Sequence, residues 1–195
     1  EISCSLVGSE MCIRDRVTTA LECTAVKEES SRMEGTPIGR TSIYVARKSD
    51  EYTIVVDTHG KLRWQADEAD GHPLLCIVSE EVPEAYLETL RQQGISWIAA
   101  GKGRIDLPKA MEALSEHFGV KRLAIVGGGH ICGGFLEAGL IDEVSIMVAP
   151  GIDGRKGQTA VFDGIADTGC NPFRLKLESV EQWPTDIVWL RYKMK

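Results

Sequence analysis

No run of apolar residues in this chain approaches the roughly 18 that a membrane-spanning helix needs. Basic residues are not in excess either, because 22 Lys and Arg stand against 29 Asp and Glu, for a formal net charge of −7. Without a basic stripe the sequence does not predict nucleic-acid binding. We therefore expect a cytoplasmic protein whose partners include neither a membrane nor nucleic acid. The acidic charge still allows an anionic cofactor, since such a ligand needs only a local cluster of donors.

The cysteines lack the spacing of a metal site or a redox motif. No two of them form Cys-x-x-Cys, and no histidine stands at ligand spacing from any of them. We expect reduced, mostly structural thiols and no bound metal. The six are Cys4, Cys12, Cys23, Cys76, Cys132 and Cys170.

The N-terminal part of the chain does not read as the start of a domain. Glu10–Arg16 resembles a translated sequencing adapter, and residues 1–16 show neither helical nor strand periodicity. We expect this foreign segment not to pack onto the domain, and the natural first segment to be missing or replaced. Residues 17–41 predict an irregular remnant, with weak helical character over Thr24–Met33.

Strands and helices alternate regularly after residue 41. A helix is predicted from Pro83 to Gly94, and another from the N-cap Asp106 to Gly119. Such alternation predicts a largely parallel sheet with helices on its faces. The strands are expected at Ser42–Ala46, Tyr52–Val56, Leu74–Val78, Ile95–Ala99, Leu123–Val126 and Glu143–Val148.

The residue pattern changes near the C-terminus. Phe173–Glu178 and Ile187–Met194 alternate apolar with polar residues and are joined by a short loop, which predicts an antiparallel hairpin. The predicted class is therefore α/β, with a mostly parallel sheet flanked by helices and a C-terminal antiparallel hairpin. Residues 42–195 are expected to form one domain of this kind.

Three glycines, Gly127–Gly129, stand between the strand Leu123–Val126 and a helix that ends near Gly139. Glycines in this position let backbone N–H groups approach a phosphate at a helix N-terminus, where the helix dipole favours an anion. The alternative is a tight turn that simply requires glycine. A Rossmann fingerprint fits less well, because its third glycine would fall at Cys132.

Gly127–Gly129, Ala138–Glu143 and the Pro150-Gly151 that follows the next strand together resemble a known family. They are similar to the dihydrofolate-reductase-like reductases of the riboflavin pathway, such as the C-terminal domain of bacterial bifunctional deaminase-reductases. The resemblance covers roughly residues 42–195. It implies an oxidoreductase that uses NADPH to reduce a carbonyl or imine carbon of a small heterocyclic or sugar-like substrate. It also implies a homodimer, which the apolar C-terminal residues Trp189, Leu190 and Tyr192 favour.

Candidate site residues follow from the ends of the strands, where α/β sheets bind ligands. The cofactor candidates are expected to line two parts of the site, one for the adenosine and one for the pyrophosphate. Ser79 would lie near the 2′-phosphate of the adenosine; the alternative is that it is only a turn serine. The substrate candidates lie in the loop after Pro150. The full set is Ser79, Gly101, Lys102, Gly127, Gly128, Gly129 and His130 for the cofactor, and Asp153 and Arg155 for the substrate; no catalytic proton donor is identified.

Two departures from the family pattern favour a second hypothesis. Val126 stands where many members carry Glu before the glycines, and the family's N-terminal strand is not visible in residues 1–41. A catalytically inactive nucleotide-binding module would account for both departures.

Overall fold

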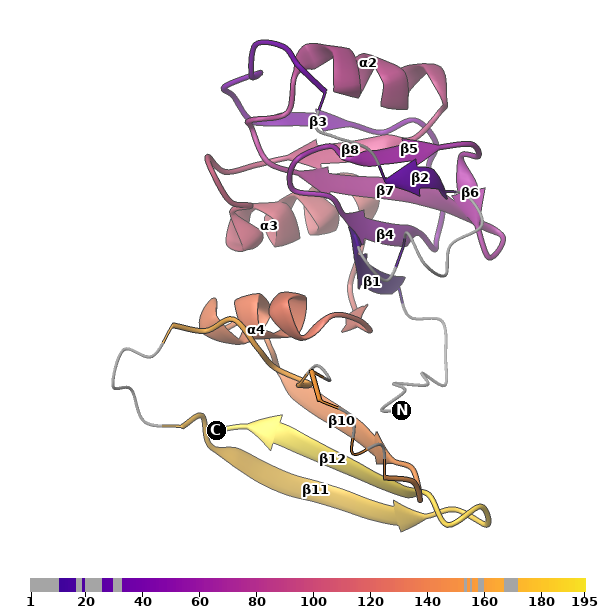
Figure 1. Ribbon diagram of the computed structural model, residues 1–195, viewed down its shortest axis with the longest axis vertical. Helices are drawn as coiled ribbons and strands as arrows, with labels where there is room; N and C mark the ends of the chain where they lie inside the picture. Colours follow the sequence, from indigo (N-terminus) through magenta and orange to yellow (C-terminus); the bar gives the residue numbers. More distant parts are fainter. Residues whose placement is uncertain are drawn as a thin grey trace. The chain divides into compact units, whose positions relative to one another are not determined.

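The computed structural model describes residues 11–16, 19, 26–29, 33–152, 154, 156–157, 160–166 and 172–195. The chain divides into two compact units: an N-terminal unit, Gly8–Gly127, and a C-terminal unit that includes Gly128–Lys195. Figure 1 shows the first in indigo to pink and the second in orange to yellow.

A seven-stranded sheet forms the centre of the N-terminal unit, with the strand order β3-β8-β7-β4-β1-β9 and β6 paired to β7. The pairs among β8, β7, β4, β1 and β9 are parallel, whereas β3 and β6 are antiparallel to their neighbours. The bounds are β1 Met11–Asp15, β3 Ser42–Tyr44, β4 Thr53–Val56, β6 Glu68–Ala69, β7 His72–Val78, β8 Ser96–Ala99 and β9 Leu123–Ile125.

Strand β1 overturns, for Met11–Asp15, the expectation that residues 1–16 do not pack onto the domain; residues 1–10 lie outside the described residues. Met11–Asp15 pairs in parallel with β4 on one side and β9 on the other, and the Ile13 side chain is completely buried. The reason is tertiary: a strand of five residues buried between two neighbours is too short to show a clear period in the sequence. A central strand is thus present within residues 1–41, where none was visible from the sequence.

The expected irregular remnant also contains a strand. β2, Val26–Glu29, pairs antiparallel with β5, Leu62–Trp64, in a separate two-stranded sheet. The weak helical character predicted over Thr24–Met33 is therefore wrong for β2. Strand β5 was not predicted either, because it spans only three residues.

Helices cover both faces of the large sheet (Figure 1). From α2, Glu84–Gln92, Tyr86, Leu87 and Leu90 pack into a core with Cys76, Val78 and Trp97, which share one face of β7 and β8. α3, Leu107–Phe118, also contacts β8, but its buried residues do not belong to that core, which places it on the other face. The predicted ends are confirmed: the Asp106 side chain accepts a hydrogen bond from Lys109 N, and Gly119 adopts φ +72°.

The C-terminal unit contains α4, Gly129–Glu137, and a three-stranded antiparallel sheet in the order β10-β12-β11. Its strands are β10 Glu143–Val148, β11 Leu175–Gln182 and β12 Val188–Met194. The predicted hairpin and the predicted fold class are confirmed. None of the helices in the described part of the chain has the length and apolar character of a membrane span.

Candidate functional site

The parallel strands of the N-terminal unit all end at one edge of the sheet. The residues that follow β4, β7, β8 and β9 at this edge are Asp57, Ser79, Ala100 and Val126. This carboxyl edge is where open α/β sheets bind ligands. The described residues of the predicted cofactor site in this unit, Ser79, Gly101, Lys102 and Gly127, all follow one of these strand ends.

Ser79 is buried, and its hydroxyl group is used within the protein. Its Oγ donates a 2.7 Å hydrogen bond to the carbonyl oxygen of Thr58 and accepts one of 3.3 Å from Glu81 N. These bonds join the turn after β4 to the turn after β7. The arrangement is the one that a turn serine gives, and the hydroxyl donor is already engaged. The role of Ser79 toward a 2′-phosphate stays a prediction.

Glu80 ties three segments together at the same edge. Its Oε1 accepts hydrogen bonds from Thr41 Oγ1 at 2.9 Å and from Gly101 N at 3.3 Å. Its backbone N–H donates to the Gly101 carbonyl oxygen at 2.8 Å, and its carbonyl oxygen accepts from Gly39 N at 2.9 Å. Glu80 is only 7% exposed. Glu80 therefore fixes the loop after β8 against the segment that enters β3, a role that the sequence did not reveal.

Gly101 requires glycine, and Lys102 is presented to solvent. Gly101 has φ +88°, and a Cβ on it would overlap the carbonyl oxygen of Arg104 and the backbone nitrogen of Asp106. The next residue, Lys102, is exposed. Arg40, which precedes the Thr41 that Glu80 joins to this loop, is exposed as well. Two exposed cations, Lys102 and Arg40, thus lie in segments that Glu80 holds together at this edge.

The glycine loop joins the end of β9 to the start of α4. Val126 N donates to Ile13 O at 3.0 Å and closes the end of β9. Gly128 is the N-cap of α4 with φ +76°, and it provides no side-chain cap to the helix. The first N–H groups of α4 are therefore left for water or a ligand. This conformation fits both a phosphate cradle and a tight turn.

A segment far along the chain, Ala160–Gly164, lies against α4. A Cβ on Gly129 would overlap the carbonyl oxygen of Ala160, and one on Gly133 would overlap the carbonyl oxygen of Asp163. The third glycine of the loop thus serves close packing. The signal was present in the sequence, because Gly129 and Gly133 are four residues apart and so share one helix face.

His130 is exposed at the start of α4 and faces this segment. Its Nδ1 lies 3.9 Å from Asp163 Oδ2, an ion-pair distance. The predicted donor therefore has a carboxylate neighbour that sequence spacing did not indicate.

Beneath the carboxyl edge, a buried polar cluster surrounds Asp57. Its Oδ2 accepts hydrogen bonds from Leu62 N at 2.8 Å and from the Tyr86 hydroxyl at 3.0 Å, which fixes the turn between β4 and β5. Burial, and then the negative charge of Asp57, raises the pKa of the Cys76 thiol well above its usual range. Burial likewise raises the pKa of Tyr86. The cluster has no exposed atom of Asp57 and serves the fold of this edge.

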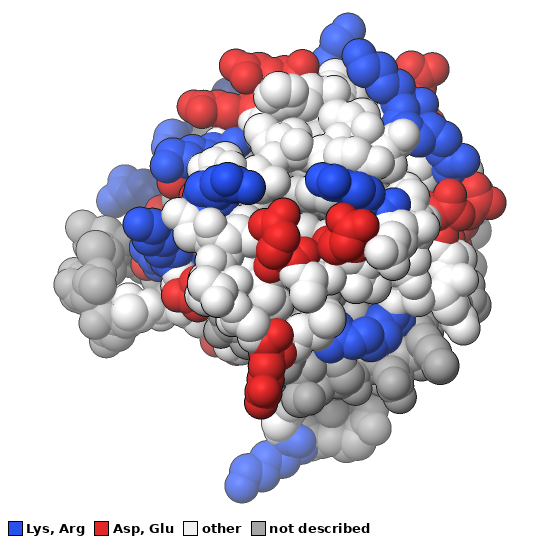
Figure 2. Space-filling view, turned by 90° about the horizontal axis from the view of Figure 1, so that it is seen from above, with Lys and Arg blue, Asp and Glu red and all other residues white. Residues whose placement is uncertain are grey.

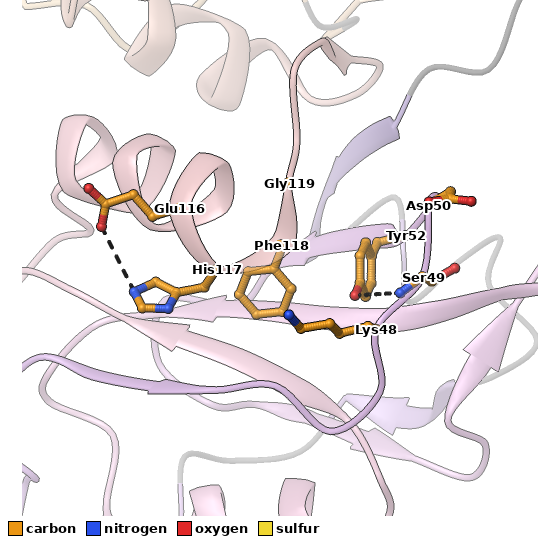
Figure 3. Close-up of a pocket in the computed structure, with 8 residues that line it drawn as sticks. All are labelled: Lys48, Ser49, Asp50, Tyr52, Glu116, His117, Phe118 and Gly119. Atoms are coloured by element: carbon orange, nitrogen blue, oxygen red, sulfur yellow. Dashed lines mark hydrogen bonds and ion pairs between the residues drawn. The ribbon is translucent and has the colours of Figure 1, made fainter.

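A hollow of about 440 Å³ in the N-terminal unit lies elsewhere. Figure 3 shows it between the C-terminal end of α3 and the segment that leads into β4, with the Tyr52 and Phe118 rings side by side. It is lined by Lys48, Ser49, Asp50, Tyr52, Glu116, His117, Phe118 and Gly119. It contains no predicted site residue and lies at the amino ends of the strands, so it is not the predicted cofactor site.

Asp153 and Arg155, the substrate candidates, lie outside the described residues. Among the residues that the structure does describe, no group of His, Cys, Asp and Glu is arranged to hold a metal ion. Figure 2 shows acidic side chains near the centre of the face seen from above, with basic side chains around them and along its upper right edge.

Comparison with known proteins gives consistent results. The profile of the family described as RibD C-terminal domain matches residues 1–189. The 2,5-diamino-6-ribosylamino-4(3H)-pyrimidinone 5′-phosphate reductase of Methanothermobacter thermautotrophicus is 31% identical over 127 residues, which cover 65% of this chain and 57% of that protein. The chain thus spans less than two thirds of this relative.

Two solved structures have the same fold. RibD from Acinetobacter baumannii superposes with a TM-score of 0.64 and 17% identity, covering 96% of this chain and 47% of that chain. A pyrimidine reductase-like protein from Corynebacterium diphtheriae gives a TM-score of 0.67 and 16% identity, covering 96% of this chain and 76% of that chain.

Proposed function

The chain belongs to the RibD C-terminal domain family, and on this premise we propose that it is an NADPH-dependent reductase. Its relatives include a pyrimidinone phosphate reductase, so the substrate class we propose is a small heterocyclic or sugar-like compound with a reducible carbonyl or imine carbon. We also propose that the protein acts in the cytoplasm and forms a homodimer.

The observation that carries the proposal is the start of α4. Gly128 has φ +76°, provides no side-chain cap, and comes at the end of a strand–glycine loop. Backbone N–H groups at such a helix N-terminus suit the pyrophosphate of a dinucleotide. Gly127, Gly128, Gly129 and His130 are the residues we assign to it.

On the N-terminal unit, the carboxyl edge supplies the residues we assign to the adenosine side. Gly101 lets the loop after β8 pack closely on the backbone of Arg104 and Asp106. Lys102 beside it is an exposed cation that suits a 2′-phosphate. We also assign Ser79 to this side, because it directly follows β7 at the same edge of the sheet. NADPH supplies a hydride when it is bound; the protein's part is to bind and orient it and the substrate. We assign Asp153 and Arg155 to the substrate.

A titration with NADPH and NADH tests the proposal. Gly128→Val requires a β-branched residue at positive φ and places a side chain in front of the α4 N–H groups, so NADPH affinity should fall at least about tenfold. The matched control is Gly139→Val at the other end of α4, where φ is +67° and no atom lies within 4 Å of the added Cβ. The control carries similar backbone strain and should retain affinity.

If a folded Gly128→Val protein bound NADPH as tightly as wild type, the loop would be a tight turn without a role in cofactor binding. The inactive nucleotide-binding module predicts a different outcome: wild-type protein that binds NADPH but does not oxidise it with pyrimidine-type substrates. Val126, in place of the family's Glu, favours that second function.

A further inference from the structure

The segment Ala160–Gly164 holds one carboxylate at a defined place beside α4. Asp163 N donates a 2.9 Å hydrogen bond to Gly129 O, which anchors its backbone on the first residue of the helix. Its Oδ1 accepts a 2.7 Å bond from Gly164 N. With both the backbone and one carboxylate oxygen fixed, Oδ2 is the oxygen that faces His130 Nδ1, at 3.9 Å.

The histidine ring lies on a glycine. A Cβ on Gly164 would stand 3.0 Å from His130 Cδ2, and Gly164 has φ +82°. A side chain there would displace the ring, so the glycine and the carboxylate together define where the imidazole lies. The ring nevertheless remains 77% exposed and accessible to a ligand.

We propose that Asp163 is a positioning residue for His130, and that the pair recognises a phosphate group of the bound dinucleotide. When the Nδ1–H of a protonated ring faces Asp163, the second N–H, on Nε2, is left to donate to an anion. The inference rests on the proposed function, because the anion is the cofactor's phosphate. It adds a second, distant segment of the chain to the site.

Binding and double-mutant analysis test the pair. His130→Gln removes the ring N–H donor that faces the phosphate, so NADPH affinity should fall by roughly tenfold, the expected loss of one hydrogen bond to a charged group. Asp163→Asn keeps an oxygen that Gly164 N reaches but removes the charge, and it should weaken binding by a smaller factor. The double variant should bind no more weakly than His130→Gln alone, since Asp163 acts through His130.

The chain offers a matched control pair. His117 Nε2 lies 4.0 Å from Glu116 Oε2 on α3, so His117→Gln and Glu116→Gln remove another exposed histidine–carboxylate pair. Neither should change NADPH affinity. A spectroscopic readout needs no cofactor: nitrogen-15 NMR of neutral His130 should show the Nδ1–H tautomer in the wild type and a shift toward Nε2–H in Asp163→Asn.

The outcomes separate this inference from the function on which it rests. Wild-type protein that does not bind NADPH would overturn both. Wild-type protein that binds NADPH, with additive losses in the two variants or an unchanged His130 tautomer in Asp163→Asn, would overturn the pair alone and leave the proposed function standing.

Discussion

The carbonyl oxygen of Asp163 occupies the place where a Cβ on Gly133 would stand, so the two residues fix how closely the segment Ala160–Gly164 approaches α4. Gly133 and Asp163 are thus in close contact although β10 and a loop separate them in the sequence. The glycine-rich composition of α4 follows from this contact as well as from the loop that precedes it.

Gly133→Ala should therefore destabilise the protein. In an open helix position the change would stabilise by about 1 kcal/mol through helix propensity. Here overpacking against the Asp163 carbonyl group should cost about 1–3 kcal/mol and outweigh that gain. Denaturant unfolding measures the net effect. Gly151→Ala, which meets no atom within 4 Å, is the control and should stay within about 0.5 kcal/mol of wild type. A more stable Gly133→Ala protein would contradict the contact.

Cys76 should make the protein lose stability at alkaline pH. Burial raises its folded-state pKa, so its contribution is complete below the unfolded-state pKa of about 8.5 and is lost as the pH rises above that value. The physical reason is that the unfolded chain releases the thiol proton while the folded chain retains it.

Cys76→Ala removes the thiol and with it this contribution to the pH dependence of stability. Between about pH 8.5 and pH 10 the free energy of unfolding of the variant should fall less steeply than that of wild type, by up to about 1.4 kcal/mol per pH unit. Urea unfolding across this range is the measurement, with Cys132→Ala, a change at a partly exposed thiol, as control. Parallel pH profiles for wild type and Cys76→Ala would show that the thiol titrates alike in both states.

Local signals predicted the elements that are defined locally. The α3 helix is the clearest case, because its Asp106 cap, its apolar spacing and Gly119 all act within one helix. The packing of Asp163 on Gly133 and the pairing of β1 with β4 and β9 depend on residues far apart in the sequence. For the same reason the sequence indicated Gly128, Gly101 and Lys102 as candidates but not Glu80 or Asp163, whose places are set by contacts with distant segments.

Substitutions in strand β1 test whether Met11–Asp15 belongs to the sheet. Ile13→Asp would place a carboxylate where the side chain is completely buried, so we expect a loss of several kcal/mol or failure to fold. Arg14→Ala is the control. It removes a partly exposed ion pair with Asp70 of 3.4 Å, and such pairs contribute about 0–1 kcal/mol. Equal, small effects of both changes would show that β1 does not belong to the sheet. The adapter-like origin of the segment stays a prediction.

The proposed homodimer makes its own prediction on the C-terminal sheet. Strand β11 is the edge strand of the order β10-β12-β11, and it exposes Leu177 by 50% and Val180 by 56%. Exposed apolar residues on an unpaired edge promote association between chains, and a lysine on such an edge opposes it. Wild-type protein should therefore show a dimeric mass by light scattering at tens of micromolar.

Leu177→Lys should shift that mass toward the monomer without loss of helical signal. Lys176→Ala, a change at an exposed charged position of the same strand, should leave the dimer intact. A monomeric wild type, or a Leu177→Lys dimer as stable as wild type, would place any self-association away from β11.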